Sequence, residues 1–190
     1  KTNNIDHCAR ICHSPTVAGL KQSLGSGAMT NSAKDILCTD LILVFGADPT
    51  ENHSVLGGQL IKAHLAGAKL IVVDPRVTRL AKLTDQHLQL KLGSNIALIN
   101  AILHVIIKEK WFDEEFISSR CQGFEHLSEH VKNITPESVE AITGVSPQLI
   151  RSLAKSYSKA KRAMIFYGMG ITQYMSGTNN VISLANLALI

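Results

Sequence analysis

The sequence predicts an α/β fold in which a mostly parallel sheet lies between two layers of helices, a three-layer αβα arrangement. Several runs are apolar throughout, and they alternate with stretches of helical periodicity. Strands covered by helices on both faces read as continuous apolar runs of this kind. The 190 residues are 45% hydrophobic and 18% charged. This composition excludes a disordered chain, and the length allows a substantial buried core.

The first elements predict a strand, a helix and a second strand. Residues 40–46 (DLILVFG) form an apolar run that ends in glycine, which is typical of a buried strand. Residues 52–66 follow with apolar side chains at helical spacing, and we expect Gly67 to cap this helix. Residues 69–74 (KLIVVD) predict a second buried strand, which Pro75 ends because proline has no N–H to donate.

The middle of the chain predicts shorter elements before a long helix. Residues 77–83 suggest a short helix, and residues 87–92 alternate apolar and polar side chains like a strand. Residues 96–110 predict a long helix, with Ser94 as its N-cap. Residues 21–31, which are rich in glycine and small polar side chains, predict a loop.

The second half continues the alternation. Residues 111–144 read as several short helices, one of them with Pro136 at its first position. Residues 148–157 predict a helix that follows Ser146-Pro147, a repeat of the same capping device. We expect a third buried strand at 162–168 and a last helix at 179–190.

Charge, hydropathy and cysteine content exclude several classes. The net charge of +4, from 19 basic and 15 acidic residues, tolerates a phosphate-bearing ligand, but the basic residues are scattered and we expect no nucleic-acid partner. No apolar run reaches the roughly 20 residues of a membrane span, so we expect no direct membrane insertion. Four cysteines do not make a disulfide framework, and we interpret Cys38 and Cys121 as buried structural residues. Six histidines match no site motif, and we expect each on a helix surface or hydrogen-bonded in the core: His53, His64, His87, His104, His126 and His130.

The loops after the strands are the first candidates for a binding site. In an open parallel sheet, ligands bind beyond the carboxyl ends of the strands. The loops there, residues 46–52, 74–76, 93–95 and 168–173, combine glycines with Asp, Asn, Gln and Arg, a set that suits a nucleotide. Ordinary turn and cap chemistry is the alternative for any single loop. The topology is Rossmann-like, but GxGxxG and P-loop motifs are missing, which weakens a plain NAD or ATP interpretation.

The amino-terminal segment carries the densest chemistry and leaves three interpretations open. His7, Cys8, Cys12 and His13 would bind zinc, although four ligands within seven residues is tighter than usual spacing. Alternatively the cysteines, Cys8 above all, are small buried hydrophobic residues. In the third interpretation Cys12 is a reactive or metal-bound thiolate beside His13 as proton acceptor, with Arg10 lowering its pKa.

Residues 3–20 (NNIDHCARICHSPTVAGL) resemble the active-site segment of formate dehydrogenase catalytic subunits, which belong to the molybdopterin oxidoreductase superfamily. The likeness covers essentially the whole chain. Four further segments continue it in order: residues 25–31, 72–76, 92–95 and 167–173. By this resemblance Cys12 stands where the family has a cysteine or selenocysteine that binds molybdenum or tungsten, and His13 is the active-site histidine.

The resemblance also implies two pterin guanine dinucleotides, one of them with its guanosine and phosphates held by a domain of this kind. Asp48 departs from some relatives, where Asn is frequent, and Glu51 departs from others, where Asp occurs. The cofactor-binding positions that the resemblance implies are Gly46, Asp48, Glu51, Asn52, Asp74, Pro75, Arg76, Gly93, Asn95, Met169, Gly170 and Gln173.

For the whole protein, the resemblance implies oxidation of formate to carbon dioxide. We interpret residues 1–190 as one αβα domain of a larger multidomain enzyme, with an active-site segment and loop at 1–38 and the nucleotide-binding sheet and helices at 39–190. The expected partners are formate, other domains of the same chain and electron-transfer subunits. A [4Fe–4S] cluster is expected as a further cofactor, in the part of the parent protein that precedes this segment. We expect a cytoplasmic location and an isolated fragment without activity. Two alternatives stay open: a periplasmic-type nitrate reductase relative, and a non-catalytic respiratory-complex relative that has lost the metal.

Overall fold

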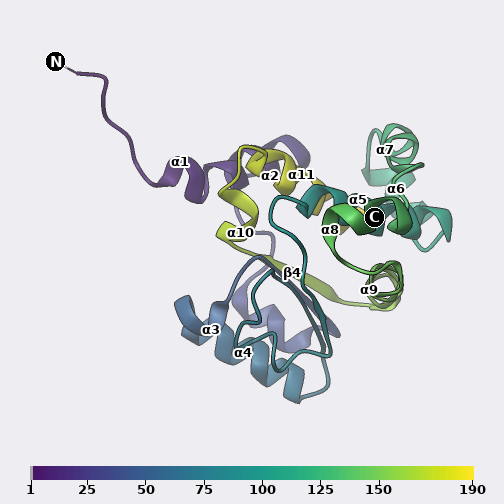
Figure 1. The fold of residues 1–190 in the computed structure, drawn as a ribbon, viewed down its shortest axis with the longest axis horizontal. Helices are drawn as coiled ribbons and strands as arrows, with labels where there is room; N and C mark the ends of the chain where they lie inside the picture. Colours follow the sequence, from purple (N-terminus) through teal and green to yellow (C-terminus); the bar gives the residue numbers. More distant parts are fainter. Residues whose placement is uncertain (1) are drawn as a thin grey trace.

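The computed structural model describes residues 2–190 (Figure 1). Its centre is a four-stranded sheet in the order β3-β2-β1-β4, and all neighbouring strands are parallel. The strands are β1 (Leu41–Phe45), β2 (Lys69–Val73), β3 (Gln86–Leu88) and β4 (Ala163–Tyr167). The predicted parallel adjacency of the first, second and last strands is confirmed, because β1 pairs with both β2 and β4.

Helices precede the sheet, connect its strands and follow it. In chain order they are α1 (Ala9–Cys12), α2 (Ser14–Leu24), the 3₁₀ helix η1 (Ala33–Cys38), α3 (Pro49–Asn52), α4 (Ser54–Leu65), α5 (Asn95–Lys108), α6 (Glu114–Arg120), α7 (Phe124–Val131), α8 (Pro136–Thr143), α9 (Pro147–Lys159), α10 (Met169–Thr172) and α11 (Gly177–Leu189). None of these helices is both long and apolar enough to cross a membrane.

Two hydrophobic cores lie on opposite faces of the sheet, because side chains alternate between faces along each strand. In β1, Leu41, Leu43 and Phe45 join a large core with α5, α9 and α11. Ile42 and Val44 join a smaller core with α4 and η1. In Figure 1, α3 and α4 lie on one side of the strands and α5, α8 and α9 on the other. The predicted three-layer αβα fold is therefore confirmed.

The predicted helix starts in the second half are confirmed. The N–H of Ser138 donates to Thr135 Oγ1 (3.2 Å) at the start of α8, and Ser146 Oγ accepts in the same way from Leu149 at the start of α9. Ser94 does precede α5, but its hydroxyl donates backward to the Lys91 carbonyl oxygen (2.6 Å) and does not cap the helix.

Two predictions between β2 and α5 are wrong. Residues 77–83 form turns and no helix, because the N–H of Ala81 donates to Thr78 Oγ1 and closes a local turn. The strand predicted at 87–92 is limited to Gln86–Leu88. The chain leaves the ladder there, since the N–H of Lys91 donates to the Thr143 carbonyl oxygen (2.7 Å).

Helix boundaries elsewhere differ from the predicted ones. The helix predicted at 52–66 is present as α4, and the short helix α3, which was not predicted, precedes it and is separated from it at His53. Helix α2 extends to Leu24 into the predicted loop and ends at Gly25, whose φ of +79° suits glycine. Residues 33–38, expected to be part of a loop, form η1.

The interpretation of the cysteines as buried residues is wrong in part. Cys38 is exposed at the end of η1, where Ile36 takes the buried position, and Cys8 is also exposed. Cys121 is half-buried. The interpretation of the histidines is better supported: His104 is buried in α5, and its Nδ1 lies 2.9 Å from the Val131 carbonyl oxygen.

Candidate functional site

The carboxyl ends of the strands bring the predicted loops to one edge of the sheet. Because the strands are parallel, the loops after β1, β2 and β4 leave the same edge. Backbone bonds tie them together: the N–H of Gly46 donates to the Val73 carbonyl (2.9 Å), and that of Gly168 donates to the Phe45 carbonyl (3.3 Å). The predicted common edge is confirmed for these loops.

The loop after β1 lies directly against the loop after β4. The N–H of Gly170 donates to the Gly46 carbonyl (3.0 Å), and a Cβ added at Gly170 would lie 2.6 Å from Gly46 Cα. Gly46 also has a φ of +54°, a region in which L side chains are strained. The Asn95 amide donates to the Gly170 carbonyl (3.3 Å), so the start of α5 belongs to the same edge.

Asp48 is the most unusual polar residue at this edge, because it is only 2% exposed. Its Oδ1 accepts the N–H of Thr50 (3.1 Å) and so caps α3. Its Oδ2 is buried and, among residues 2–190, has no hydrogen-bond partner. A buried carboxylate oxygen without a donor is costly, so this atom suits a ligand that brings an N–H or O–H group.

The turn after β2 places a cation at the edge. Asp74 is 3% exposed, and its Oδ1 accepts the N–H of Arg76 (2.8 Å) and lies 3.4 Å from Arg76 Nε. The Arg76 side chain is largely exposed. Asp74 therefore shapes the turn, while the charge of Arg76 faces solvent beside it. The remaining predicted positions in these loops are exposed or half-buried: Glu51, Asn52, Pro75, Gly93, Met169 and Gln173.

Cys12 and His13 lie where α1 ends and α2 begins. Thr172 Oγ1 donates to the Cys12 carbonyl oxygen (2.7 Å), which attaches this junction to the loop after β4. Cys12 is half-buried and His13 is exposed. The structure therefore brings the two predicted catalytic residues to the edge that carries the predicted cofactor-binding loops.

The zinc interpretation of this segment does not fit the geometry. Cys8 Sγ lies 4.0 Å from Nδ1 of the adjacent His7. Within the described part of the chain, no three His, Cys, Asp or Glu side chains are grouped to hold a metal ion. Arg10, expected beside the Cys12 thiol, pairs instead with Asp6, with Nε and Oδ2 2.7 Å apart, and this hydrogen bond lowers the pKa of Asp6.

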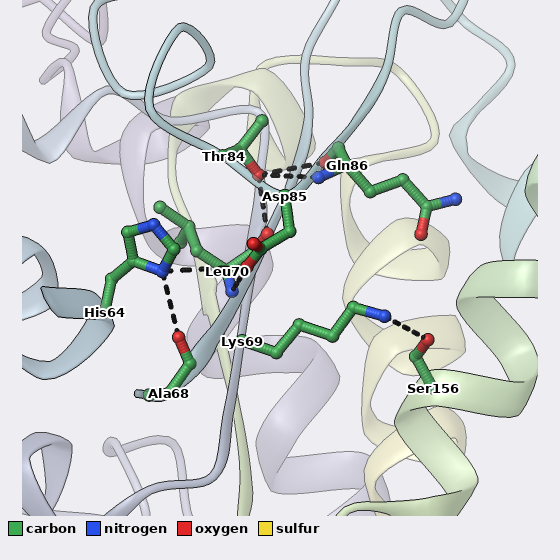
Figure 2. A network of polar contacts seen from close by, with 8 residues as sticks. All are labelled: His64, Ala68, Lys69, Leu70, Thr84, Asp85, Gln86 and Ser156. Carbon is green, nitrogen blue, oxygen red and sulfur yellow. Dashed lines mark hydrogen bonds and ion pairs between the residues drawn. The ribbon is translucent and has the colours of Figure 1, made fainter. Parts of the chain in front are cut away.

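The opposite edge of the sheet carries a second polar network that sequence reasoning missed (Figure 2). His64 Nδ1 lies 2.9 Å from the Ala68 carbonyl oxygen and 3.6 Å from Asp85 Oδ2, which also accepts the N–H of Leu70 (2.8 Å). Lys69 Nζ donates to Ser156 Oγ (2.7 Å). His64, Ala68, Lys69 and Asp85 line an open depression of about 600 Å³. Their polar groups are already bonded within the network, which joins β2 to the turn before β3 and to α9.

Comparison with known families decides the identity of the chain. The sequence profile of the molybdopterin oxidoreductases matches residues 1–190. The chain belongs to the molybdopterin oxidoreductase family. The predicted family resemblance is thereby confirmed.

Individual relatives of this molybdopterin oxidoreductase chain are similar over its full length. It is 50% identical to formate dehydrogenase H of Escherichia coli over 189 residues, which are 26% of that protein. It is 50% identical to the F420-dependent formate dehydrogenase 1 subunit alpha of Methanococcus maripaludis, of which it covers 28%. An assimilatory nitrate reductase catalytic subunit of Bacillus subtilis is 34% identical and is covered to 27%. The chain thus spans about a quarter of the length of these relatives.

A solved structure supports the fold. Acetylene hydratase from Pelobacter acetylenicus superposes with a TM-score of 0.85 at 27% identity, over 96% of this chain and 25% of that one. The α/β architecture described above is therefore that of a part of a larger molybdopterin-family enzyme.

Proposed function

We propose that this chain is the part of a formate-oxidising enzyme that supplies the metal ligand and binds one guanosine of the cofactor. One observation carries the proposal: Thr172 ties Cys12 to the same edge of the sheet that holds the four polar loops. The relatives support formate as the substrate, since the two formate dehydrogenases are 50% identical and the nitrate reductase 34%. The intact Cys12-His13 pair favours a catalytic protein over a relative that has lost the metal.

The proposed cofactor is molybdenum or tungsten with two pterin guanine dinucleotides, and the residues at the edge fit its chemistry. The unpartnered Asp48 Oδ2 would accept from the N–H groups of a guanine base. The free N–H groups in the first turn of α5 would bind phosphate, because an α-helix leaves its first amides without partners. Arg76, in the turn after β2, adds a positive charge at the same edge of the sheet.

Within the proposed reaction, formate gives carbon dioxide, a proton and two electrons, and the metal cofactor, when bound, would supply the acceptor for the electron pair. Cys12 would hold the metal through its thiolate, because metal binding requires the deprotonated sulfur. The imidazole of His13 would take up the proton, because a ring nitrogen of histidine is a common general base. The protein contributes position and charge, and the cofactor supplies the redox chemistry.

Other parts of the full-length protein complete this proposal. The chain spans about a quarter of the length of its relatives. We therefore propose that it forms one side of the cofactor site and that other domains form the remaining sides. A [4Fe–4S] cluster and electron-transfer subunits would carry the electrons away. The description of the Methanococcus maripaludis relative as a subunit alpha supports such partners.

The test of the proposed function is formate-dependent dye reduction by the full-length enzyme. Cys12→Ser should abolish it, because a hydroxyl is a poor replacement for a soft thiolate ligand. Cys8→Ser, which changes an exposed cysteine one helical turn away, should leave it intact. His13→Ala should slow turnover by about 10²–10⁴-fold, the usual effect of losing a general acid–base group. Wild-type rates in Cys12→Ser would contradict the proposal.

A further inference from the structure

Thr172 makes an unusual connection between distant parts of the chain. Its hydroxyl donates to the carbonyl oxygen of Cys12 at 2.7 Å, across 160 positions of sequence. Thr172 is only 2% exposed, so water does not compete well for this bond. The acceptor belongs to the residue whose sulfur is the proposed metal ligand.

The donor side of this bond is held rigidly. Asn180, which is 2% exposed, donates through Nδ2 to the Ile171 carbonyl (2.8 Å). One residue earlier, the Gly170 carbonyl accepts from Asn95, and the Gly170 N–H donates to Gly46. Two buried amide side chains and one backbone bond therefore fix the short helix α10, and with it the position of the Thr172 hydroxyl.

The acceptor side is held by helix packing as well. Helix α2, which begins at Ser14, packs against α11, and Figure 1 shows α2, α10 and α11 gathered at one end of the molecule. The approach is close, because a Cβ added at Gly19 would lie 2.7 Å from Val181 Cγ1. This packing secures α2 without Thr172. What the Thr172 bond adds is the placement of the peptide group of Cys12, just before α2 begins.

We propose that Thr172 is a positioning residue: its hydrogen bond to the Cys12 carbonyl sets where the Cys12 sulfur lies relative to the cofactor-binding edge. This inference rests on the proposed function and deepens it. Misplacement of a reacting group by about 1 Å can cost a hundredfold in rate, so one buried hydrogen bond at this point has a measurable effect.

The test compares three variants of the full-length enzyme: Thr172→Val, Thr172→Ser and Thr143→Val. Valine keeps the shape of threonine and removes the hydroxyl, whereas serine keeps the hydroxyl. Thr143 is the matched control, because it is fully buried and its hydroxyl also donates to a backbone carbonyl, that of Val139 (2.9 Å), within α8 and not at the Cys12 junction.

Two measurements are made on each variant. Amide hydrogen exchange of residues 9–14 in cofactor-free enzyme reports the opening of the segment that the bond holds, and Thr172→Val should accelerate it about fivefold, the effect of losing one hydrogen bond. In loaded enzyme, Thr172→Val should change the EPR spectrum of the bound metal and lower kcat about tenfold while KM changes less than twofold. Thr172→Ser should restore both properties to within twofold of wild type.

Specific outcomes would overturn the inference. The inference would be wrong if exchange and EPR spectra were unchanged in Thr172→Val. It would also be wrong if Thr172→Ser did not restore both properties, or if Thr143→Val had equal effects. Failure of the proposed function is distinguishable: wild-type activity in Cys12→Ser would reject Cys12 as the metal ligand, while the exchange measurement would still report whether Thr172 holds its peptide.

Discussion

At the scale of single residues, Asp48 is the clearest sign of a ligand at the carboxyl edge. One carboxylate oxygen caps α3, and the other is buried with no donor among the described residues. The family resemblance predicted this position as cofactor-binding. The sequence could not show that one of the two carboxylate oxygens already accepts a hydrogen bond as a helix cap. A capping role alone needs only one oxygen, so the second is the atom that a guanine would engage.

Asp48→Ala should therefore reduce guanine nucleotide retention about tenfold or more in the full-length enzyme, because it removes the carboxylate oxygen that would accept from guanine. Alanine also removes the helix cap, and the control variant below separates that effect. The measurement is the amount of guanine nucleotide released from purified enzyme on denaturation, per mole of protein.

Asp113→Ala is the control for this change. Asp113 also caps a helix, since it accepts the N–H of Phe116 (2.9 Å) at the start of α6, away from the proposed site. Equal nucleotide content in wild type and Asp48→Ala, or an equal loss in Asp113→Ala, would show that Asp48 acts only as a cap.

At the scale of elements, the close approach of the loops after β1 and β4 defines the centre of the edge. Gly170→Ala should destabilise the chain by about 1–3 kcal/mol, because the new Cβ would lie 2.6 Å from Gly46 Cα and both loops would have to shift. Urea denaturation of wild-type and variant chains measures the difference in the free energy of unfolding.

Gly58→Ala provides the matched comparison in helix α4. A Cβ there meets nothing within 4 Å, and alanine favours helix over glycine by about 0.5–1 kcal/mol, so this variant should be as stable as wild type or more stable. A Gly170→Ala chain as stable as Gly58→Ala would mean that the two loops are not packed as described.

The elements also show what the sequence could predict. Strands β1, β2 and β4 were readable because burial on both faces requires apolar residues at every position. The break at His53, the short β3 and the turn at 77–83 were not, because they depend on contacts from elsewhere, such as the bond from Lys91 to Thr143. The bond between Thr172 and Cys12 could not be predicted from the sequence either, since it joins residues 160 positions apart.

At the scale of the whole molecule, the two ends of the sheet differ in their chemistry. At the amino end, Lys69, Asp85 and their neighbours bond to one another (Figure 2). The carboxyl end carries four features: a carboxylate oxygen without a partner among residues 2–190, the first amides of α5, an exposed arginine and the cysteine junction. This asymmetry is the main structural support for one ligand-binding edge.

The 190-residue chain by itself should show no formate-dependent dye reduction, whereas the full-length enzyme should show it. A wall of the site offers a fraction of the cofactor contacts, while the cost of ordering the cofactor remains. The assay is run on both proteins after incubation with the isolated cofactor. Robust turnover by the 190-residue chain would mean that the site is complete without other domains.

The most direct test of the central claim is X-ray absorption at the metal edge of the full-length enzyme, which counts the sulfur atoms bound to the metal. If Cys12 is the protein ligand, the Cys12→Ser enzyme should retain the metal with one sulfur neighbour fewer than wild type, and the Cys8→Ser enzyme should match wild type. An unchanged sulfur count in a metal-loaded Cys12→Ser enzyme would contradict the account.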